Sequence, residues 1–343
     1  MPRRWEHKEW AGNAPIGMVK EFSESKIIGW VSVSDESKPP KITLHVNGVP
    51  VYETVPAISR EYKSNTNVRE FYIGMRQIWD FCKKTDRLTV RMNGNILPIA
   101  GEGIYMNPAR DGERSLDELV VILARGHVLN RRGSLQKKKT LNKKWQADVL
   151  DFQAGVSAEL KRAFNIETFI VYGTLLGSVR EGGVIDHDTD IDLAYISKHE
   201  EGRRAAEEIT EIAKHFAQTE EFDSRLTKVG LHVHDRANPN VRIDIFHLYF
   251  DERGLLKFPH GIAGHTEYKS SQWVGLEKTK FLDYTFNIPI NPEPILEHIY
   301  GSNWRTPIVG FNWDHARTTQ AVEAFTTEEE RLAVKKLNAR PEA

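Results

Sequence analysis

The most constraining stretch of the sequence is VYGTLLGSVREGGVIDHDTDIDLAY, residues 171–195, where Asp186, Asp188, Asp190 and Asp192 stand at a strict spacing of two. On a continuous strand these carboxylates would share one face, because side chains alternate with period two. Like charges held so close together repel one another strongly unless cations neutralise them. The spacing therefore predicts a metal site.

Apolar residues predict where the strand of this stretch begins. Ile191 and Leu193 flank Asp192 in strand register, whereas a Gly-Gly pair keeps the earlier part irregular. We therefore expect Asp190 and Asp192 side by side on a strand, and the two earlier aspartates on the loop that leads into it.

A Gly-Ser pair, Gly177-Ser178, precedes the aspartates at a predicted helix start or tight turn. Backbone N–H groups near a helix N-terminus hold phosphate oxygens, and adjacent carboxylates hold hard divalent cations such as Mg²⁺. Gly-Ser followed by Asp-hydrophobic-Asp resembles the signature of the nucleotidyltransferase superfamily. Cations at such a site neutralise the charge that develops on the transferred phosphorus and on the leaving oxygen.

A third carboxylate on a neighbouring strand completes such a site, and Asp244 is the candidate. It stands in VRIDIFHLYF between Ile243 and Ile245. The alternative is an ion pair with Arg242, which we disfavour because neighbouring residues of a strand face opposite sides.

The stretch GTLLGSVREGGVIDHDTDIDL resembles the LicD/fukutin family of bacterial phosphocholine transferases and their animal relatives that move ribitol phosphate. The family pattern runs approximately G-T-L-L-G-x-x-R and then I-P-H-D-D-D-I-D. Further landmarks are DIF at residues 244–246 and YGSNWRTP at residues 300–307, so the resemblance covers roughly residues 141–315. Asp186 stands where Pro is usual and Thr189 where Asp is frequent, but the Asp-x-Asp pair is intact.

The resemblance implies a metal-dependent phosphotransferase that uses Mg²⁺ or Mn²⁺. Such an enzyme moves a phosphorylated small group, a choline, alditol or sugar phosphate, from a CDP-linked donor to a hydroxyl of a cell-surface glycan such as a capsule or lipopolysaccharide, and it releases CMP. The expected metal ligands are Asp190, Asp192 and Asp244. Asp188 or His187 is the expected base for the acceptor hydroxyl.

Residues upstream of the aspartates are the expected contacts of the donor. Thr174 and Ser178 either contact phosphate or cap the following helix. Arg180 either bridges donor phosphates with its planar fork or pairs with the aspartates. Trp304 either stacks on a base or sugar or packs in the core, and we favour the core. The full set of expected substrate-binding residues is Gly173, Thr174, Gly177, Ser178 and Arg180.

Two other functions share parts of this pattern. A nucleotidyltransferase would move the nucleotidyl group of a nucleoside triphosphate to a small molecule or a protein, and would release pyrophosphate instead of CMP. A non-catalytic glycan-binding protein would keep the fold without the reaction, although all the expected carboxylates are present.

The N-terminal region predicts a different fold from the rest. Short strand-like runs pair across Asn47-Gly48 and Asn93-Gly94, which suit two-residue type I′ turns. We therefore expect an antiparallel β-sandwich, a candidate glycan-binding module, ahead of an α+β domain with a nucleotidyltransferase-like mixed sheet and flanking helices. The expected segments are the sandwich at 1–106, a linker and basic helical segment at 107–140, the catalytic domain at 141–326 and a charged tail at 327–343.

Composition narrows the partners. Lys+Arg 47 against Asp+Glu 48 gives a net charge of -1, which disfavours nucleic acid, and 40% hydrophobic residues fit a soluble globular protein. With no run of about 18 apolar residues and one cysteine, Cys82, we expect a cytoplasmic protein. A run of basic residues follows the predicted linker and comprises Arg131, Arg132, Lys137, Lys138, Lys139, Lys143 and Lys144. This basic run indicates either a solvated surface or peripheral contact with a polyanionic glycan or the inner membrane leaflet. The oligomeric state is not legible from the sequence.

Overall fold

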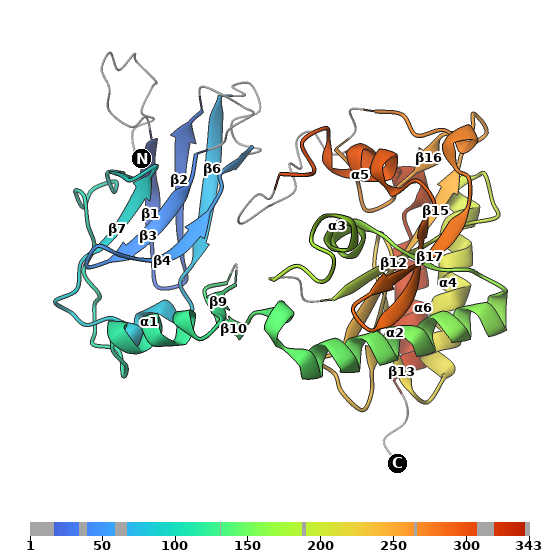
Figure 1. The fold of residues 1–343 in the computed structure, drawn as a ribbon, viewed down its shortest axis with the longest axis horizontal. Helices are drawn as coiled ribbons and strands as arrows, with labels where there is room; N and C mark the ends of the chain where they lie inside the picture. The colour runs from blue at the N-terminus through green and yellow to red at the C-terminus, as the bar shows by residue number, and fades with distance from the viewer. Residues whose placement is uncertain are drawn as a thin grey trace. The chain divides into compact units, whose positions relative to one another are not determined.

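The computed structural model describes residues 17–33, 40–58, 67–130, 132–186, 190–263, 266–306 and 319–339. The described residues divide into two compact units, one ending at Lys137 and the other beginning at Lys138 (Figure 1). Among the described residues, no helix is long and apolar enough to cross a membrane.

The first unit is an antiparallel β-sandwich, as the sequence predicts. Its two sheets have the orders β1-β2-β6-β5 and β4-β3-β7-β8, and both contribute to one hydrophobic core. The strand β3 alternates buried and half-buried residues, so one face points into that core. The strands are β1 (Gly17–Phe22), β2 (Lys26–Ser32), β3 (Ile42–Val46), β4 (Val49–Thr54), β5 (Ala57–Ile58), β6 (Val68–Gly74), β7 (Leu88–Met92) and β8 (Asn95–Ile96).

Both Asn-Gly turns have the predicted backbone. Asn47 and Gly48 have φ of 50° and 84°, and Asn93 and Gly94 have φ of 48° and 88°. These positive angles are what a two-residue hairpin needs to match the twist of its strands.

The segment after the sandwich belongs to the first unit. Helix α1 (Leu116–Ala124) begins with the predicted capping box of Ser115 and Glu118, and Leu119 is buried in the sandwich core. The hairpin of β9 (His127–Leu129) and β10 (Leu135–Lys137) also precedes the boundary. The structure therefore divides the chain at Lys137, and the described residues 107–130 and 132–137 belong to the first unit, where the sequence suggested a linker.

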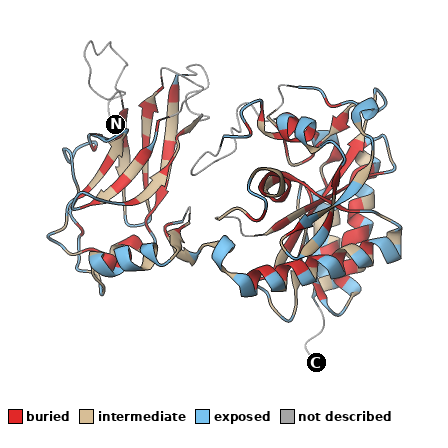
Figure 2. Ribbon diagram, viewed as in Figure 1, coloured by how far each residue is buried: buried red, intermediate tan, exposed pale blue. Residues whose placement is uncertain are grey.

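A mixed sheet forms the centre of the second unit, and Figure 2 shows its strands rich in buried residues. The order is β11-β12-β15-β14-β13, with β16 also pairing with β15. Strands β12 and β15 run parallel, and the other pairs are antiparallel. The strands are β11 (Phe169–Ile170), β12 (Ile191–Ile196), β13 (Phe222–Leu226), β14 (Leu231–Asp235), β15 (Arg242–Phe250) and β16 (Leu256–Lys257), and β17 (Leu276–Phe281) pairs separately with β18 (Tyr284–Pro289).

Helices flank this sheet, which confirms the predicted α+β class. Glu159 of α2 lies 2.5 Å from His215 of α4, and Ser224 of β13 donates to the carbonyl of Ala213 in α4. The sheet face that carries Ser224 is therefore covered by α4. The helices are α2 (Lys143–Phe164), α3 (Tyr172–Arg180), α4 (Gly202–Gln218), α5 (Pro292–Tyr300) and α6 (Glu328–Asn338), with short 3₁₀ turns at Lys139–Leu141, Ser270–Gln272 and Val322–Ala324; a further one, Ile78–Phe81, lies in the first unit.

Lysines of the basic run have partners within the second unit. Lys138 pairs with Asp186 at 3.1 Å, Lys144 pairs with Asp148 at 2.8 Å, and Lys139 lies 3.9 Å from the ring centroid of Trp145. These contacts involve three of the seven basic residues of that run. Arg131 lies outside the described residues.

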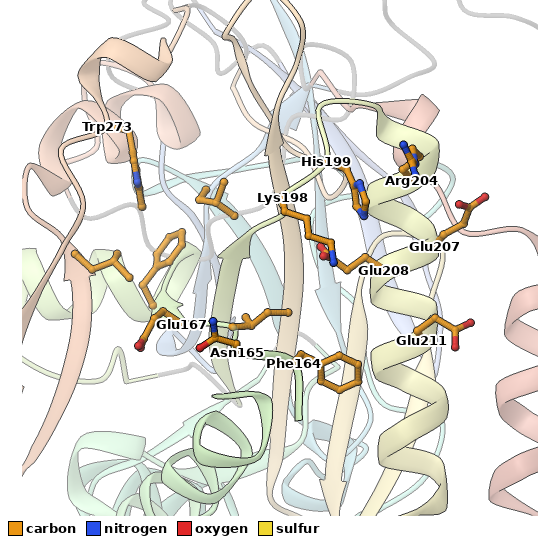
Figure 3. Close-up of a pocket in the computed structure, with 14 residues that line it drawn as sticks. Phe164, Asn165, Glu167, Lys198, His199, Arg204, Glu207, Glu208, Glu211 and Trp273 are labelled. Carbon is orange, nitrogen blue, oxygen red and sulfur yellow. The ribbon is translucent and has the colours of Figure 1, made fainter. Parts of the chain in front are cut away.

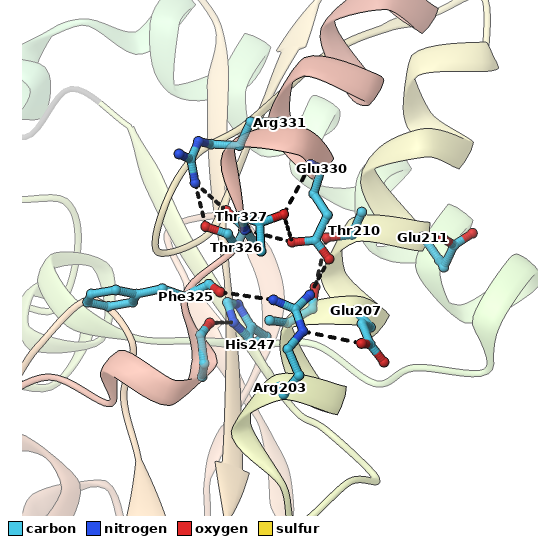
Figure 4. A network of polar contacts seen from close by, with 12 residues as sticks. Arg203, Glu207, Thr210, Glu211, His247, Phe325, Thr326, Thr327, Glu330 and Arg331 are labelled. Carbon is cyan, nitrogen blue, oxygen red and sulfur yellow. Dashed lines mark hydrogen bonds and ion pairs between the residues drawn. The ribbon is translucent and has the colours of Figure 1, made fainter.

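The C-terminal segment is part of the second unit, although the sequence suggested a separate charged tail. A capping box of Thr327 and Glu330 starts α6, which packs on α4 and β13. Figure 4 shows Arg203 of α4 pairing with Glu330 and donating to the carbonyl of Phe325. Apolar packing adds to these contacts, because Val334 is fully buried.

Two buried side chains of β15 hold the residues just before α6. His247 donates from Nε2 to the carbonyl of Ala324 at 2.8 Å, and Tyr249 donates to Glu323 at 2.8 Å. Thr326 donates to the carbonyl of Thr227 at 2.7 Å. The central strand and the C-terminal segment are thus joined by hydrogen bonds.

If α6 is integral to the second unit, Val334→Ala will lower the free energy of unfolding by about 1–3 kcal/mol, because it opens a cavity in a closed core. The matched change in the same helix is Leu332→Ala, where the leucine is 49% exposed. We expect it to change stability by no more than about 0.5 kcal/mol. Urea unfolding of both variants measures the difference, and equal losses would contradict the packing of α6.

The buried imidazole of His247 predicts a pH dependence of stability. Burial lowers its pKa from 6.5 to about 4. Between these values the unfolded chain binds a proton that the folded chain does not, so stability falls as pH drops from 6.5 towards 4. From pH 7 to pH 5 the loss from this residue is on the order of 2 kcal/mol. We expect His247→Gln, which keeps an N–H donor without titrating, to lose correspondingly less free energy of unfolding between pH 7 and pH 5 than the wild type. Urea unfolding at both pH values measures this difference, and an identical dependence on pH in the two proteins would refute it.

Candidate active site

Parallel pairing of β12 and β15 sets two of the predicted carboxylates side by side. The register places Asp192 opposite Asp244, and Ile191 opposite Ile243. Because side chains alternate along a strand, the two isoleucines lie on the face covered by α4 and the two aspartates on the other. Asp192 lies in the strand and Asp186 on the loop before it, as predicted, but Asp190, which was predicted to share the strand, immediately precedes its first residue.

The same face continues into a polar row on β14 and β13. His232 lies opposite Asp244, with Nε2 3.6 Å from Oδ2, and Arg225 lies opposite His232. His234 occupies the next position of this face, opposite Arg242. Burial, followed by the charges of Arg225, His234 and His260, lowers the pKa of His232 from 6.5 to about 4.

Sequence reasoning missed the histidines of β14. The signal was present in LHVHD, where His232 and His234 alternate with Leu231 and Val233, the period of a half-buried strand. What the sequence could not supply was the pairing of this strand with β15, which brings His232 beside Asp244.

Arg242 pairs with two of the carboxylates. Its Nε lies 2.8 Å from Oδ1 of Asp244, its Nη2 lies 3.2 Å from Oδ2 of the same residue, and it also pairs with Asp190. The sequence argument that Arg242 and Asp244 face opposite sides was wrong. They are two positions apart, and residues two apart on a strand share a face.

The start of α3 holds Asp192 in place. The backbone N–H of Gly173 donates to Oδ2 of Asp192 at 3.0 Å, and the backbone N–H of Asp192 donates to the hydroxyl of Thr174 at 2.8 Å. A carboxylate at this end of the helix is also favoured by the helix dipole. Thr174 is only 2% exposed, and its hydroxyl oxygen already accepts the hydrogen bond from Asp192. Its position therefore does not suit the predicted contact with a donor phosphate.

The helix begins earlier than the sequence suggested. Val171 is the N-cap of α3, so the pair of glycine and hydroxyl residue at the helix start is Gly173-Thr174. Gly177-Ser178 lies in the second turn, and the prediction that it stands at the helix start was wrong. Only Val171 separates the end of β11 at Ile170 from the first helical residue, Tyr172, whose φ is 44°.

Gly177 has a packing role in the second turn. A Cβ atom at this position would lie 2.4 Å from the carbonyl oxygen of Gly183. Its own carbonyl accepts from the N–H groups of Glu181 and Gly183. Gly177 therefore lets the loop that leads to the aspartates close over the helix, and the half-buried Ser178 follows it in α3.

Arg180 ends α3 away from the aspartates. It lies seven residues after Gly173, roughly 10 Å along the helix. Its guanidinium pairs with Glu181 at 2.7 Å and donates to the carbonyl of Trp304 at 3.1 Å. Trp304 itself is buried, in agreement with the packing interpretation.

The loop before β12 is anchored through Asp186. Its carboxylate pairs with Lys138 and accepts from Thr140, and its carbonyl accepts from the N–H of Lys139. The two candidates for the base, His187 and Asp188, lie outside the described residues together with Thr189.

The donor chemistry of the cluster suits a hard divalent cation. Asp190, Asp192 and Asp244 offer only carboxylate oxygens, which Mg²⁺ and Mn²⁺ prefer. In the part of the chain that the structure describes, no group of three or more His, Cys, Asp or Glu side chains is arranged to hold a metal ion. Within the cluster, the Arg242 guanidinium pairs with Asp190 and Asp244.

A pocket of about 820 Å³ lies at the other end of β12. Figure 3 shows Trp273 on one side of it and His199 on the other, with Lys198 close to Glu208 of α4. Ile196, four residues after Asp192, also lines it, so roughly 13 Å of strand separates this pocket from the aspartates. The pocket contains none of the predicted site residues.

Comparison with known proteins identifies the domain that carries the aspartates. Residues 165–291 match the family model described as LicD/FKTN/FKRP, nucleotidyltransferase domain. The match runs from the segment before β11 to the end of the β17–β18 hairpin, and so includes Gly173, Asp192 and Asp244. It confirms the family resemblance predicted from the sequence. Comparison with curated proteins finds no match.

Two helical glycines provide a matched test of the loop packing. Gly177→Ala will destabilise the second unit by about 1–3 kcal/mol, because its new methyl group meets the backbone of Gly183. Gly155→Ala in α2 meets no atom within 4 Å and will stabilise by about 0.5–1 kcal/mol, because alanine favours the helix. Urea unfolding measures both changes, and two shifts of the same sign would contradict the close approach at Gly177.

Proposed function

Because residues 165–291 carry a nucleotidyltransferase domain of the LicD/FKTN/FKRP family, we propose that this chain is a metal-dependent phosphotransferase. The family match supports a transferase of the type that modifies glycans. The proposed reaction moves a choline, alditol or sugar phosphate from a CDP-linked donor to a hydroxyl of a cell-surface glycan, with release of CMP. The proposed location is the cytoplasm, at the inner face of the membrane, and the β-sandwich is proposed to bind glycan.

One observation carries this proposal. Asp192 and Asp244 are register partners on parallel strands, and Asp192 is held by the N–H of Gly173 at the start of α3. Carboxylates fixed from two directions in this way are preorganised, and preorganised charge is what phosphoryl transfer requires of a protein.

Each residue of the site has a part in the proposed reaction. Asp190, Asp192 and Asp244 would hold Mg²⁺ or Mn²⁺, which when bound supplies positive charge next to the donor phosphates. The acceptor oxygen forms a bond to the phosphorus of the transferred group, and the bond from that phosphorus to the oxygen of CMP breaks. The proton of the acceptor hydroxyl passes to Asp188 or His187. Gly173 keeps the Asp192 carboxylate oriented throughout, and the Thr174 hydroxyl holds the backbone N–H of Asp192.

The main competing function transfers the nucleotidyl group itself. It uses the same carboxylates but breaks the bond next to the α-phosphate of a nucleoside triphosphate, so its product is pyrophosphate. Product identity therefore separates the two functions, and a protein that binds glycan without catalysis would give neither product.

The test measures CMP and pyrophosphate released by the full chain from CDP-choline, CDP-ribitol, CDP-glycerol, CTP and ATP, each with a panel of glycan acceptors. We expect CMP from one CDP-linked donor with Mg²⁺ and none with EDTA. Asp192→Asn keeps an acceptor for the N–H of Gly173 but removes the charge, and should lower the rate at least about 100-fold.

The matched control is Asp223→Asn, an exposed carboxylate of β13. It removes the same charge from the same sheet outside the cluster, and its rate should stay within about twofold of the wild type. Pyrophosphate release from CTP or ATP would replace the proposal with nucleotidyl transfer. Equal rates for Asp192→Asn and the wild type would refute the role of the carboxylates.

A further inference from the structure

We propose that Arg242 is a tethered counter-ion of the carboxylate cluster, which competes with the divalent cation for the same oxygens and leaves them when that cation binds. This inference rests on the metal dependence in the proposed function, and adds to it a residue that sets metal affinity. It assigns to Arg242 a positioning role that the family resemblance does not include.

The first argument is the geometry of the ion pairs. The Arg242 guanidinium donates from Nη2 to Oδ2 of Asp244 at 3.2 Å, its Nε lies 2.8 Å from Oδ1 of the same carboxylate without a hydrogen bond between them, and it also pairs with Asp190. A guanidinium carries its donors in a planar fork, so that one arginine side chain can contact two carboxylates at once. One side chain thus links the carboxylate of Asp190, which immediately precedes β12, to that of Asp244 in β15.

The second argument is the need for a cation. The side chains of Asp190 and Asp244 are only 12% and 10% exposed, so water screens their mutual repulsion poorly. Asp192 adds a third carboxylate on the neighbouring strand, opposite Asp244. A buried acidic cluster of this kind is costly without a positive partner, and Arg242 supplies one within the chain.

The third argument is that the two partners exclude each other. A hard cation binds carboxylates through the same oxygens that the guanidinium engages. The cation and the guanidinium therefore compete for these oxygens, and the ion pairs to Asp190 and Asp244 are the contacts that we propose to break when the metal binds. The Arg242 side chain is 33% exposed, so the fork has solvent to turn into when it leaves.

The test compares Arg242→Met with Arg225→Met. Arg225 lies on the same sheet face in β13, two strands from Asp244 and so roughly 10 Å away, and it is exposed. Both changes remove one positive charge near the cluster, but only the first removes the ion pairs. Arg242→Lys is the third variant, because a lysine keeps the charge without the fork that reaches two carboxylates at once.

Binding of Mn²⁺ to the full chain, measured from the electron paramagnetic resonance signal of the free ion, gives the first readout. We expect Arg242→Met to bind Mn²⁺ at least about tenfold more tightly than the wild type, and Arg242→Lys to lie between them. The Mn²⁺ affinity of Arg225→Met should stay within about twofold of the wild type, because the charge that it removes lies about one screening length of physiological salt from the cluster.

Thermal unfolding gives the second readout without any metal. In EDTA, Arg242→Met should unfold several degrees below the wild type, because its carboxylates have lost their counter-ion, and added Mn²⁺ should raise its melting temperature more than that of the wild type. Arg225→Met should have the same melting temperature as the wild type both in EDTA and with added Mn²⁺.

The outcomes separate this inference from the proposed function. Equal Mn²⁺ affinity in Arg242→Met and the wild type would overturn the competition while leaving the metal dependence in place. Absence of Mn²⁺ binding in the wild type and in every variant would overturn the proposed metal dependence together with the competition. Equal melting temperatures of Arg242→Met and the wild type in EDTA would overturn the counter-ion role independently of either.

Discussion

The parallel pairing of β12 with β15 is the constraint on which the rest of the site depends. A slip of one residue would move Asp192 to the face covered by α4 and bring an isoleucine into its place, because every side chain changes face. The apolar partners Ile191 and Ile243 oppose that slip, since both are buried on the covered face. The hydrophobic core of the second unit therefore also fixes the position of the carboxylates.

Elements that are distant in sequence then hold the cluster from several sides. The N-terminus of α3 orients Asp192 through Gly173 and Thr174, and the close contact at Gly177 sets the course of the loop that follows. From the other side, Arg242 neutralises the carboxylate of Asp244. The α3 contacts involve Asp192 alone, whereas Arg242 pairs with both Asp190 and Asp244. Arg242 is thus the side chain of the site that we propose to move when a metal binds.

The sequence predicted local features well and long-range pairing poorly. The Asn-Gly hairpins, the capping box at Ser115 and the strand at Asp192 follow from residues next to one another, and all three are present. The sequence placed Gly177-Ser178 at a helix start or tight turn, whereas α3 begins at Tyr172, close to a second glycine and hydroxyl pair, Gly173-Thr174. The neighbour His232 and the packing of α6 depend on contacts between distant segments, which periodicity does not reveal. The error at Arg242 was different, since the alternation of a single strand was enough to place it beside Asp244.

The most direct test of the account is a crystal structure of the protein grown with MnCl₂ and CDP, with anomalous diffraction measured at the manganese edge. We predict an anomalous peak within coordination distance of oxygens of Asp192 and Asp244, with the Arg242 guanidinium turned away from Asp244. Crystals without such a peak, in which Arg242 still pairs with Asp190 and Asp244, would contradict the assignment of these carboxylates to a metal.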